Sequence, residues 1–208
     1  MKLKNKNTKI GKKGQYQYIA CEKKRRIIRT ILMFLPSIAL LITGLVLYKD
    51  RNNWFTIGAV LACLPACKQM VGIIMIFMYQ SMTPTFYEKV CEKQGSLTML
   101  YETILTNYEK NVQVDAFAIC GNQVVGYTSN AKADVKYAEK NTMSILKHNG
   151  YDVKVKVFKD ERKFLEQLDH MNRQADTLRA NIEFIPDERY PALSREELIR
   201  HTILAISL

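Results

Sequence analysis

Two long apolar segments near the beginning of the chain constrain its fold more than any other feature of the sequence. The first is Ile31–Tyr48, eighteen residues without a charged side chain. As an α-helix it would be about 27 Å long, close to the thickness of the hydrocarbon core of a bilayer. The second is Trp54–Tyr79, which only Lys68 and Gln69 interrupt. Five residues separate the two, so the sequence predicts membrane-spanning helices at 31–48 and 54–79 that form an antiparallel hairpin within residues 30–79.

The second segment carries a lysine near its centre. A lysine at the middle of a membrane span costs about 2.5–3.5 kcal/mol on insertion scales. We expect Lys68 to hydrogen-bond carbonyl groups that Pro65 frees in the helix, or to extend toward the membrane surface. A second interpretation gives Lys68 and its neighbour Gln69 a functional role, in a pore or at an interface between copies of the chain.

Small residues recur along the second segment at intervals of four. Gly58, Ala62 and Ala66 would form one row on a helix. Rows of this kind allow the backbones of membrane helices to approach closely. The row therefore predicts close packing in the hairpin and self-association of the chain through it.

Positive charge is concentrated at the beginning of the chain. Residues 1–29 contain eleven lysines or arginines and one acid, so they carry most of the net charge of +11. By the positive-inside rule this basic arm is cytoplasmic, and the hairpin returns residues 80–208 to the same side. We therefore expect a two-span protein of the cell membrane with both termini in the cytoplasm. Anionic lipid head groups would bind the basic residues beside the first span, and nucleic-acid binding by the arm is the alternative. These residues are Lys23, Lys24, Arg25, Arg26 and Arg29.

The cysteines and histidines do not form a recognisable metal motif. Cys63 and Cys67 have metal-like spacing, but no further cysteine or histidine is close to them in the sequence. The three histidines are isolated from one another. We expect no metal site, no cofactor and no disulfide framework, in keeping with a cytosolic compartment.

Residues 80–208 are long enough for one domain of mixed helices and strands. Turn residues, helix caps and the period of the apolar residues indicate its elements. They predict a helix at 85–94, strands at 97–109, 112–120 and 123–129, a helix from Asn130 to Asn149, a strand at 151–158, a helix after Asp160, a short strand at 181–185 and a last helix from Ser194. The predicted fold class is therefore membrane-anchored α+β (α/β), a two-helix transmembrane hairpin followed by a cytosolic α-β-β-β-α-β domain with extra C-terminal helices.

Two acidic residues lie at notable places in this order of elements. Glu88 is in the first helix of the domain, and Asp115 is in the second strand, within the stretch VDAFAIC. With this order, residues 85–158 resemble the core of the restriction-endonuclease-like superfamily and the nuclease-related domain. The resemblance implies a site made of a helical acid, a strand aspartate and Glu-x-Lys on the third strand. Here the third strand reads VVGYTSN without that pair, and the nearest lysine is Lys132.

The incomplete pattern argues against metal-dependent cleavage. Such chemistry needs several carboxylates to hold Mg²⁺ or Mn²⁺, and these ions would be cofactors only of an active nuclease. Residues 80–208 contain 17 basic and 18 acidic side chains, so nucleic acid is not an expected partner.

We expect a membrane-anchored cytosolic interaction or sensory module. It would bind a protein partner or a second copy of the chain and would not catalyse a reaction. Its domain would be a non-catalytic nuclease-like fold. The alternatives are a membrane-tethered metal-dependent nuclease and a small pore or transport component that uses Lys68.

Overall fold

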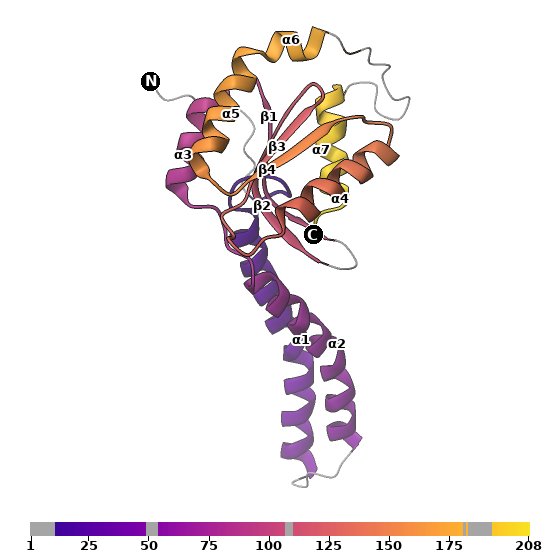
Figure 1. Ribbon diagram of the computed structural model, residues 1–208. Coiled ribbons are helices and arrows are strands. Elements are labelled where there is room, and N and C mark those ends of the chain that lie inside the picture. Colours follow the sequence, from indigo (N-terminus) through magenta and orange to yellow (C-terminus); the bar gives the residue numbers. More distant parts are fainter. Residues whose placement is uncertain (1–10, 49–53, 107–109, 181, 183–192) are drawn as a thin grey trace. The chain divides into compact units, whose positions relative to one another are not determined.

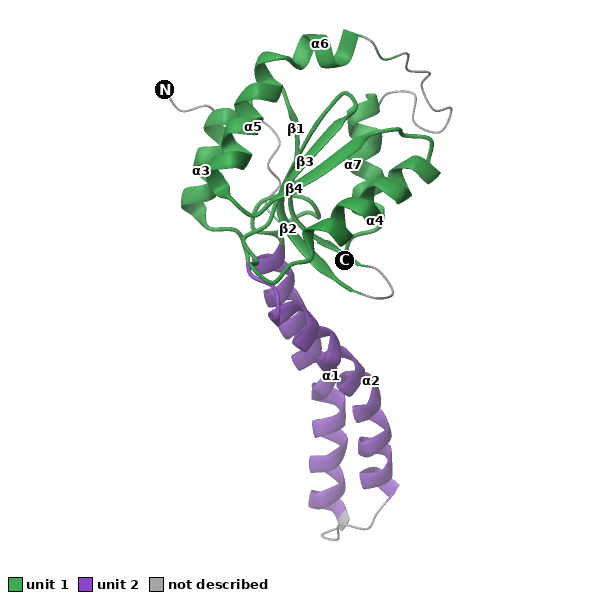
Figure 2. Ribbon diagram, viewed as in Figure 1, with its two compact units in different colours: residues 1–18, 81–208 green, residues 19–80 purple. Residues whose placement is uncertain are grey.

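The computed structural model describes residues 11–48, 54–106, 110–180, 182 and 193–208 (Figure 1). The chain divides into two compact units (Figure 2). One unit is helical and spans residues 19–80, and the other combines residues 1–18 with residues 81–208.

The helical unit consists of α1 (Tyr18–Tyr48) and α2 (Trp54–Phe77). α1 contains the whole apolar segment Ile31–Tyr48 and begins earlier, at Tyr18. Residues 18–29 contain no glycine or proline and several strong helix formers, which explains why the helix extends through them. Residues 18–29 of the predicted basic arm 1–29 are therefore the first part of α1. The turn between the two helices, residues 49–53, lies outside the described residues.

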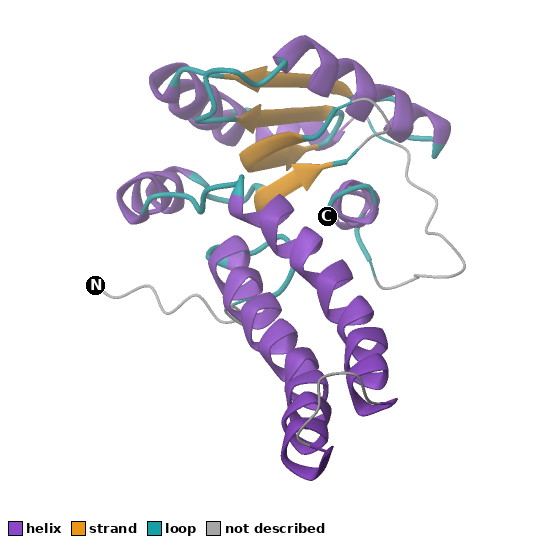
Figure 3. Ribbon diagram, turned by 90° about the horizontal axis from the view of Figure 1, so that it is seen from below, coloured by secondary structure: helices purple, strands orange, loops and turns teal. Residues whose placement is uncertain are grey.

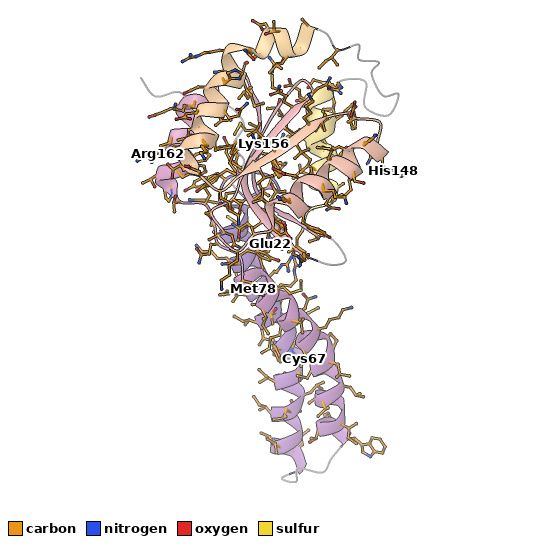
Figure 4. The ribbon with its side chains drawn as sticks, in the orientation of Figure 1. Glu22, Cys67, Met78, His148, Lys156 and Arg162 are labelled. Atoms are coloured by element: carbon orange, nitrogen blue, oxygen red, sulfur yellow. The ribbon has the colours of Figure 1, made fainter. Side chains whose placement is uncertain are left out.

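Both helices are long and apolar enough to cross a membrane, by length and composition. Only 17% and 11% of the residues in their most apolar stretches are buried. Trp54 is 87% exposed and Met78, just after α2, is 77% exposed. Figure 4 shows the side chains of this unit projecting outward along the length of the hairpin, Met78 and Cys67 among them. A core helix of a water-soluble protein would instead be covered by its neighbours.

The second unit contains a four-stranded mixed sheet with the order β1-β2-β3-β4. Its strands are β1 (Thr98–Leu105), β2 (Val112–Cys120), β3 (Gln123–Tyr127) and β4 (Lys154–Phe158). β1 and β3 pair antiparallel with β2, whereas β4 pairs parallel with β3. The parallel pair requires a crossover, which α4 (Val135–His148) provides. With α3 (Pro84–Lys93) before the sheet, the predicted α-β-β-β-α-β order of elements is confirmed.

Helices cover both faces of this sheet (Figures 1 and 3). α4 and α7 (Arg195–Ala205) lie on one face, where their buried residues Leu146, Ile199 and Ile203 join the strands in one apolar cluster. α3, α5 (Glu161–Arg173) and the short α6 (Ala175–Ala180) contribute to the cluster on the other face. All nine residues of β2 are buried, as expected for a central strand covered on both sides.

Several predicted boundaries change in the structure. α4 begins at Val135 and is capped by Asp134, not by Asn130, so that prediction was wrong. The Asn130 side chain instead accepts a hydrogen bond from the Lys132 N–H, which forms a local turn ahead of the helix. Caps at Asp160 and Ser194 are confirmed, the second as a complete capping box with Glu197. α6 was not predicted, and of the predicted strand at 181–185 only Ile182 is described, outside any strand.

The described end of the basic arm packs onto the sheet domain. The Tyr101 N–H on β1 donates to the Gly14 carbonyl at 3.0 Å, and Lys13 Nζ donates to the Ser207 carbonyl at 2.5 Å. The rings of Tyr16 and Tyr87 stack with their centroids 4.0 Å apart. This segment covers part of the free edge of β1. Residues 13–16 therefore belong to the same unit as the sheet, although the sequence places them in the basic arm 1–29.

Candidate functional site

Asp115 lies in the central strand β2 and is 2% exposed. Its Oδ1 accepts a hydrogen bond from Gln113 Nε2 at 2.6 Å, and its Oδ2 accepts one from the Ser129 N–H at 2.7 Å. Ser129 follows the end of β3, so the carboxylate holds the chain where it leaves the sheet. Both oxygens thus serve the fold, which is the use that buried carboxylates commonly have when they accept internal hydrogen bonds.

The other two residues of the nuclease-like pattern are placed differently. Glu88 on α3 and Lys132 before α4 are exposed, and neither makes a hydrogen bond or ion pair with Asp115 in the described chain. Over the described ranges, no three histidine, cysteine, aspartate or glutamate side chains come together as a set of metal ligands. The structure therefore brings Asp115 together with Gln113 and Ser129, and not with the residues that the resemblance suggested.

A second buried carboxylate, which the sequence analysis missed, lies on the neighbouring strand. Glu102 on β1 is 1% exposed, and its Oε1 accepts hydrogen bonds from the Met82 N–H at 3.0 Å and from the Ser81 hydroxyl. Its φ of +49° is in the left-handed region, which non-glycine residues rarely adopt. The only signal in the sequence was an acid in the middle of a predicted strand. Glu102 fixes the entry to α3, and its strained backbone is compensated by these bonds.

In the helical unit, polar side chains connect the two helices. Ser37 Oγ donates to the Ala59 carbonyl at 2.7 Å, Arg26 Nη1 donates to the Gly72 carbonyl at 3.0 Å, and Lys23 Nζ donates to the Tyr79 carbonyl at 2.7 Å. The second and third contacts are cations near the C-terminal end of α2, where the helix dipole favours positive charge. These bonds hold the two helices in one register.

The basic residues in the first turns of α1 thus divide into two groups. Arg25 and Arg26 form ion pairs with the buried Glu22, and Lys23 is engaged with the end of α2. Lys24 and Arg29 are exposed and have no hydrogen-bond or ion-pair partner among the described residues. Internal contacts therefore occupy three of the five residues that the sequence analysis assigned to lipid head groups. Lys24 and Arg29 keep their charges directed to solvent.

The row of small residues on α2 is split between two sides of the helix. Ala66 is buried, as is Ala59, the residue after Gly58, so this side packs within the hairpin. A Cβ built on Gly58 would meet no atom within 4 Å, so Gly58 faces open space. Ala62, between them, is half-buried.

The polar residues in the middle of α2 are Lys68 and Gln69. Lys68 is exposed and makes no hydrogen bond or ion pair in the described part of the chain, so bonding to carbonyls freed by Pro65 is not observed. Gln69 is half-buried. Within the described residues, no side chain or carbonyl group therefore compensates the charge of Lys68.

A cavity of about 360 Å³ opens beside the turn between β2 and β3. Four parts of the domain line it: the start of β1, the turn itself, the end of α6 with Ile182, and the first residues of α7. Three of the residues that line the cavity have charged side chains: Arg179, Arg195 and Glu196.

Glu196 is the centre of the hydrogen-bond network at this cavity. Its Oε1 accepts from Arg179 Nε at 2.9 Å and from the Gly121 N–H at 3.0 Å. Its Oε2 accepts from Arg179 Nη2 at 3.0 Å and from Thr98 Oγ1 at 2.9 Å. The pairing of Arg179 with the carboxylate is bidentate, the strongest geometry for this ion pair. Glu196 thus joins α7 to α6, to β1 and to the β2–β3 turn.

The ionisation of these groups follows from their surroundings. Burial alone would raise the pKa of Glu196, but hydrogen bonds from Arg179, Gly121 and Thr98 outweigh it and lower the pKa of the carboxyl below its usual value. The bond to Glu196 raises the pKa of Arg179. Burial lowers the pKa of Arg195, which has no carboxylate bonded to it in the described chain. All three groups are therefore charged near neutral pH.

The turn beneath the cavity requires glycine. Gly121 has a φ of +56°, and a Cβ there would lie 2.3 Å from the Leu178 carbonyl oxygen of α6. The sequence predicts the strands at 112–120 and 123–129 on either side of this turn, and a helix from Ser194, but not that the turn and the helix lie together. No local signal indicated that Arg179 and Glu196 meet there.

Comparisons of the chain with protein-family models, with curated proteins and with solved structures found no match.

Proposed function

We propose that the chain is a membrane-anchored interaction or sensory module. α1 and α2 form a two-span hairpin in the cell membrane, and the sheet domain and both termini are cytoplasmic. The observation that carries this proposal is the outward exposure of large apolar side chains along both helices. Transfer of this surface from water into lipid is favourable by about 25 cal/mol per Å².

The charge distribution supports the orientation. Lys24 and Arg29 are free of internal partners among the described residues, near the start of α1 and before its apolar part. In the cytoplasmic orientation they meet anionic head groups, each with about 1 kcal/mol of attraction. The opposite orientation would violate the positive-inside rule.

A non-catalytic, nuclease-like sheet domain is the second part of the proposal. The order of elements from α3 to β4 supports the likeness, and the engagement of both Asp115 oxygens by Gln113 and Ser129 supports a structural role for that residue. With Glu88 and Lys132 exposed and apart from this network, the domain acts through a protein partner or through a second copy of the chain. Self-association uses the open side of α2 at Gly58.

Membrane insertion is tested with the full chain expressed in bacterial cells. We expect it to remain in the membrane pellet after extraction with alkaline carbonate and to enter solution only with detergent. Recovery of the chain in the carbonate supernatant would overturn the anchoring.

The orientation is tested by cysteine labelling. In a parent lacking Cys21, Cys63, Cys67 and Cys91, the fully buried Cys120 is retained. Ser144→Cys, at an exposed site on α4, is expected to react with a membrane-impermeant maleimide only in inside-out vesicles. Asn52→Cys, between the two helices, is expected to react in intact cells. Labelling of Ser144→Cys in intact cells would contradict a cytoplasmic domain, and the unmodified parent measures the background.

The enzymatic alternative is tested with the full chain in detergent, Mn²⁺ and labelled DNA or RNA. Glu88→Ala is the informative variant, because Glu88 is exposed and its removal leaves the core intact. We expect no cleavage by either protein. Cleavage by the parent that Glu88→Ala abolishes would establish a nuclease and overturn the non-catalytic proposal.

The exposed, unpartnered Lys68 favours one second candidate, a small pore or transport component. Ion flux through proteoliposomes containing the chain tests it. Flux that Lys68→Leu abolishes, while carbonate-resistant insertion is unchanged, would favour the pore.

A further inference from the structure

We propose that the cavity lined by Arg179, Arg195 and Glu196 binds a small organic oxyanion, a molecule that carries a phosphate or carboxylate group. The proposal concerns the sheet domain and does not depend on whether the hairpin enters a membrane. All of the residues used here belong to the unit that contains residues 81–208.

Arg179 is held in place with part of its guanidinium unused. Nε and Nη2 bond Glu196, and Nη2 also donates to the Ser96 carbonyl at 2.9 Å. Nη1 has no hydrogen-bond partner within the described chain, and the side chain is 37% exposed. Glu196 therefore fixes the direction of the guanidinium, while two N–H groups remain for a ligand.

Arg195 is fixed from a different side. Its Nη1 donates to the Gly121 carbonyl at 2.8 Å, and its guanidinium lies over the ring of Tyr151 at 5.9 Å. In the described residues its only hydrogen-bond acceptor is this neutral carbonyl, so its charge has no bonded counter-ion. An oxyanion in the cavity would supply the missing partner by a charge-assisted hydrogen bond.

The charge at the cavity selects an anion. Two guanidinium groups and one carboxylate leave one net positive charge, and the carboxylate oxygens of Glu196 already accept four hydrogen bonds. The ion pair between Arg179 and Glu196 has a purely structural explanation, because it connects α6 to α7. Arg195 also makes structural contacts, but in the described residues its positive charge is bonded to no carboxylate.

The size of the cavity indicates that the ligand is larger than an ion alone. A volume of about 360 Å³ lies at the lower end of the range of small-molecule sites. Ile182 supplies an apolar wall, and the exposed Ser96 lies at its border. The ligand class is therefore a compact organic molecule with one anionic head group.

The test is calorimetric titration of the full chain in detergent with three soluble probes: inorganic phosphate, glycerol 3-phosphate and citrate. A fourth probe, short-chain phosphatidic acid, presents the same phosphate on a lipid. We expect saturable binding of at least one probe at one site per chain. Binding of phosphatidic acid alone would assign the oxyanion to a lipid head group, and binding of the soluble probes would assign it to a free metabolite-like anion.

Variants locate the binding. Arg195→Gln is expected to weaken binding at least tenfold, and the matched control Arg200→Gln, on the same helix but outside this cavity, to change it less than twofold. Ser96→Trp, at an exposed position on the border, fills the cavity without changing charge and is expected to abolish binding. It keeps the test valid if Arg195→Gln fails to fold.

Two results would overturn the proposal. One is the absence of saturable binding of all four probes by the folded parent chain. The other is equal weakening by Arg195→Gln and Arg200→Gln together with normal binding by Ser96→Trp, because this pattern indicates a general effect of charge and not the cavity.

Discussion

The N–H of Ser129 donates to Asp115 Oδ2 at 2.7 Å, so the aspartate in the middle of the sheet anchors the chain that leaves β3. Gln113, two residues earlier on the same strand, bonds the other oxygen. The residue that most resembled a nuclease ligand in the sequence therefore acts as a buried hydrogen-bond acceptor, and this role can be measured.

Asp115→Ala is expected to lower the free energy of unfolding by about 1–3 kcal/mol, because it removes the carboxylate that accepts hydrogen bonds from the buried Gln113 amide and from the Ser129 N–H. Asp152→Ala, at an exposed site, is the matched control and should change it by less than about 0.5 kcal/mol. Urea unfolding of the full chain in detergent, followed by near-ultraviolet circular dichroism, measures both. Equal midpoints for the two variants would show that the Asp115 network does not stabilise the domain.

Gly121→Ala and Gly150→Ala separate backbone strain from steric overlap. Both glycines have positive φ, +56° and +85°, but only the first would bring a Cβ against backbone, the Leu178 carbonyl oxygen. We expect Gly150→Ala to cost about 1–2 kcal/mol from strain. Gly121→Ala should cost about 1–3 kcal/mol more from overpacking. The same urea unfolding experiment measures both variants. A smaller loss of unfolding free energy for Gly121→Ala than for Gly150→Ala would contradict close packing of the turn on α6.

Acid should weaken the domain through Glu196. Its pKa is lowered in the folded state, so its contribution to stability is present above the usual value of 4.5 and is lost as the pH falls through the lowered pKa. Glu196→Gln should lower stability at neutral pH and make the unfolding midpoint less dependent on pH below 4.5. The exposed Glu88→Gln serves as the control. If Glu196→Gln leaves the acid profile of the parent unchanged, the Arg179–Glu196 pair is not the source of this dependence.

Self-association through α2 should depend on its open side. Gly58→Leu places a large side chain where a second copy would approach, and we expect it to weaken association about tenfold, equivalent to about 1.4 kcal/mol. Val60→Leu, at a position that is already large and exposed, should have little effect. Energy transfer between labelled chains in proteoliposomes measures the association. Unchanged transfer for Gly58→Leu would place any interface elsewhere.

Much of the fold could be predicted because its signals are local. The uncharged run from Ile31 follows from composition, and the alternation around Val155 and Val157 follows from the period of a strand with one covered face. Asp160 and Ser194 were recognisable as helix caps because a cap bonds N–H groups within three residues of itself. Asn130 and Asp134 are both residue types that cap helices, and the prediction named Asn130, whereas Asp134 caps α4 in the structure.

The sequence by itself determined the two apolar helices, the order of elements from α3 to β4 and the absence of a Glu-x-Lys pair, since each depends on neighbouring residues alone. Only the tertiary structure decided that Asp115 is an internal acceptor and that Glu196 meets Gly121, 75 residues away, and Thr98, 98 residues away. Such contacts form when helices and strands distant in the chain pack together, and burial then makes each hydrogen bond costly to leave unmade. The cavity beside Arg195 arises from that packing, and no single stretch of the sequence contains it.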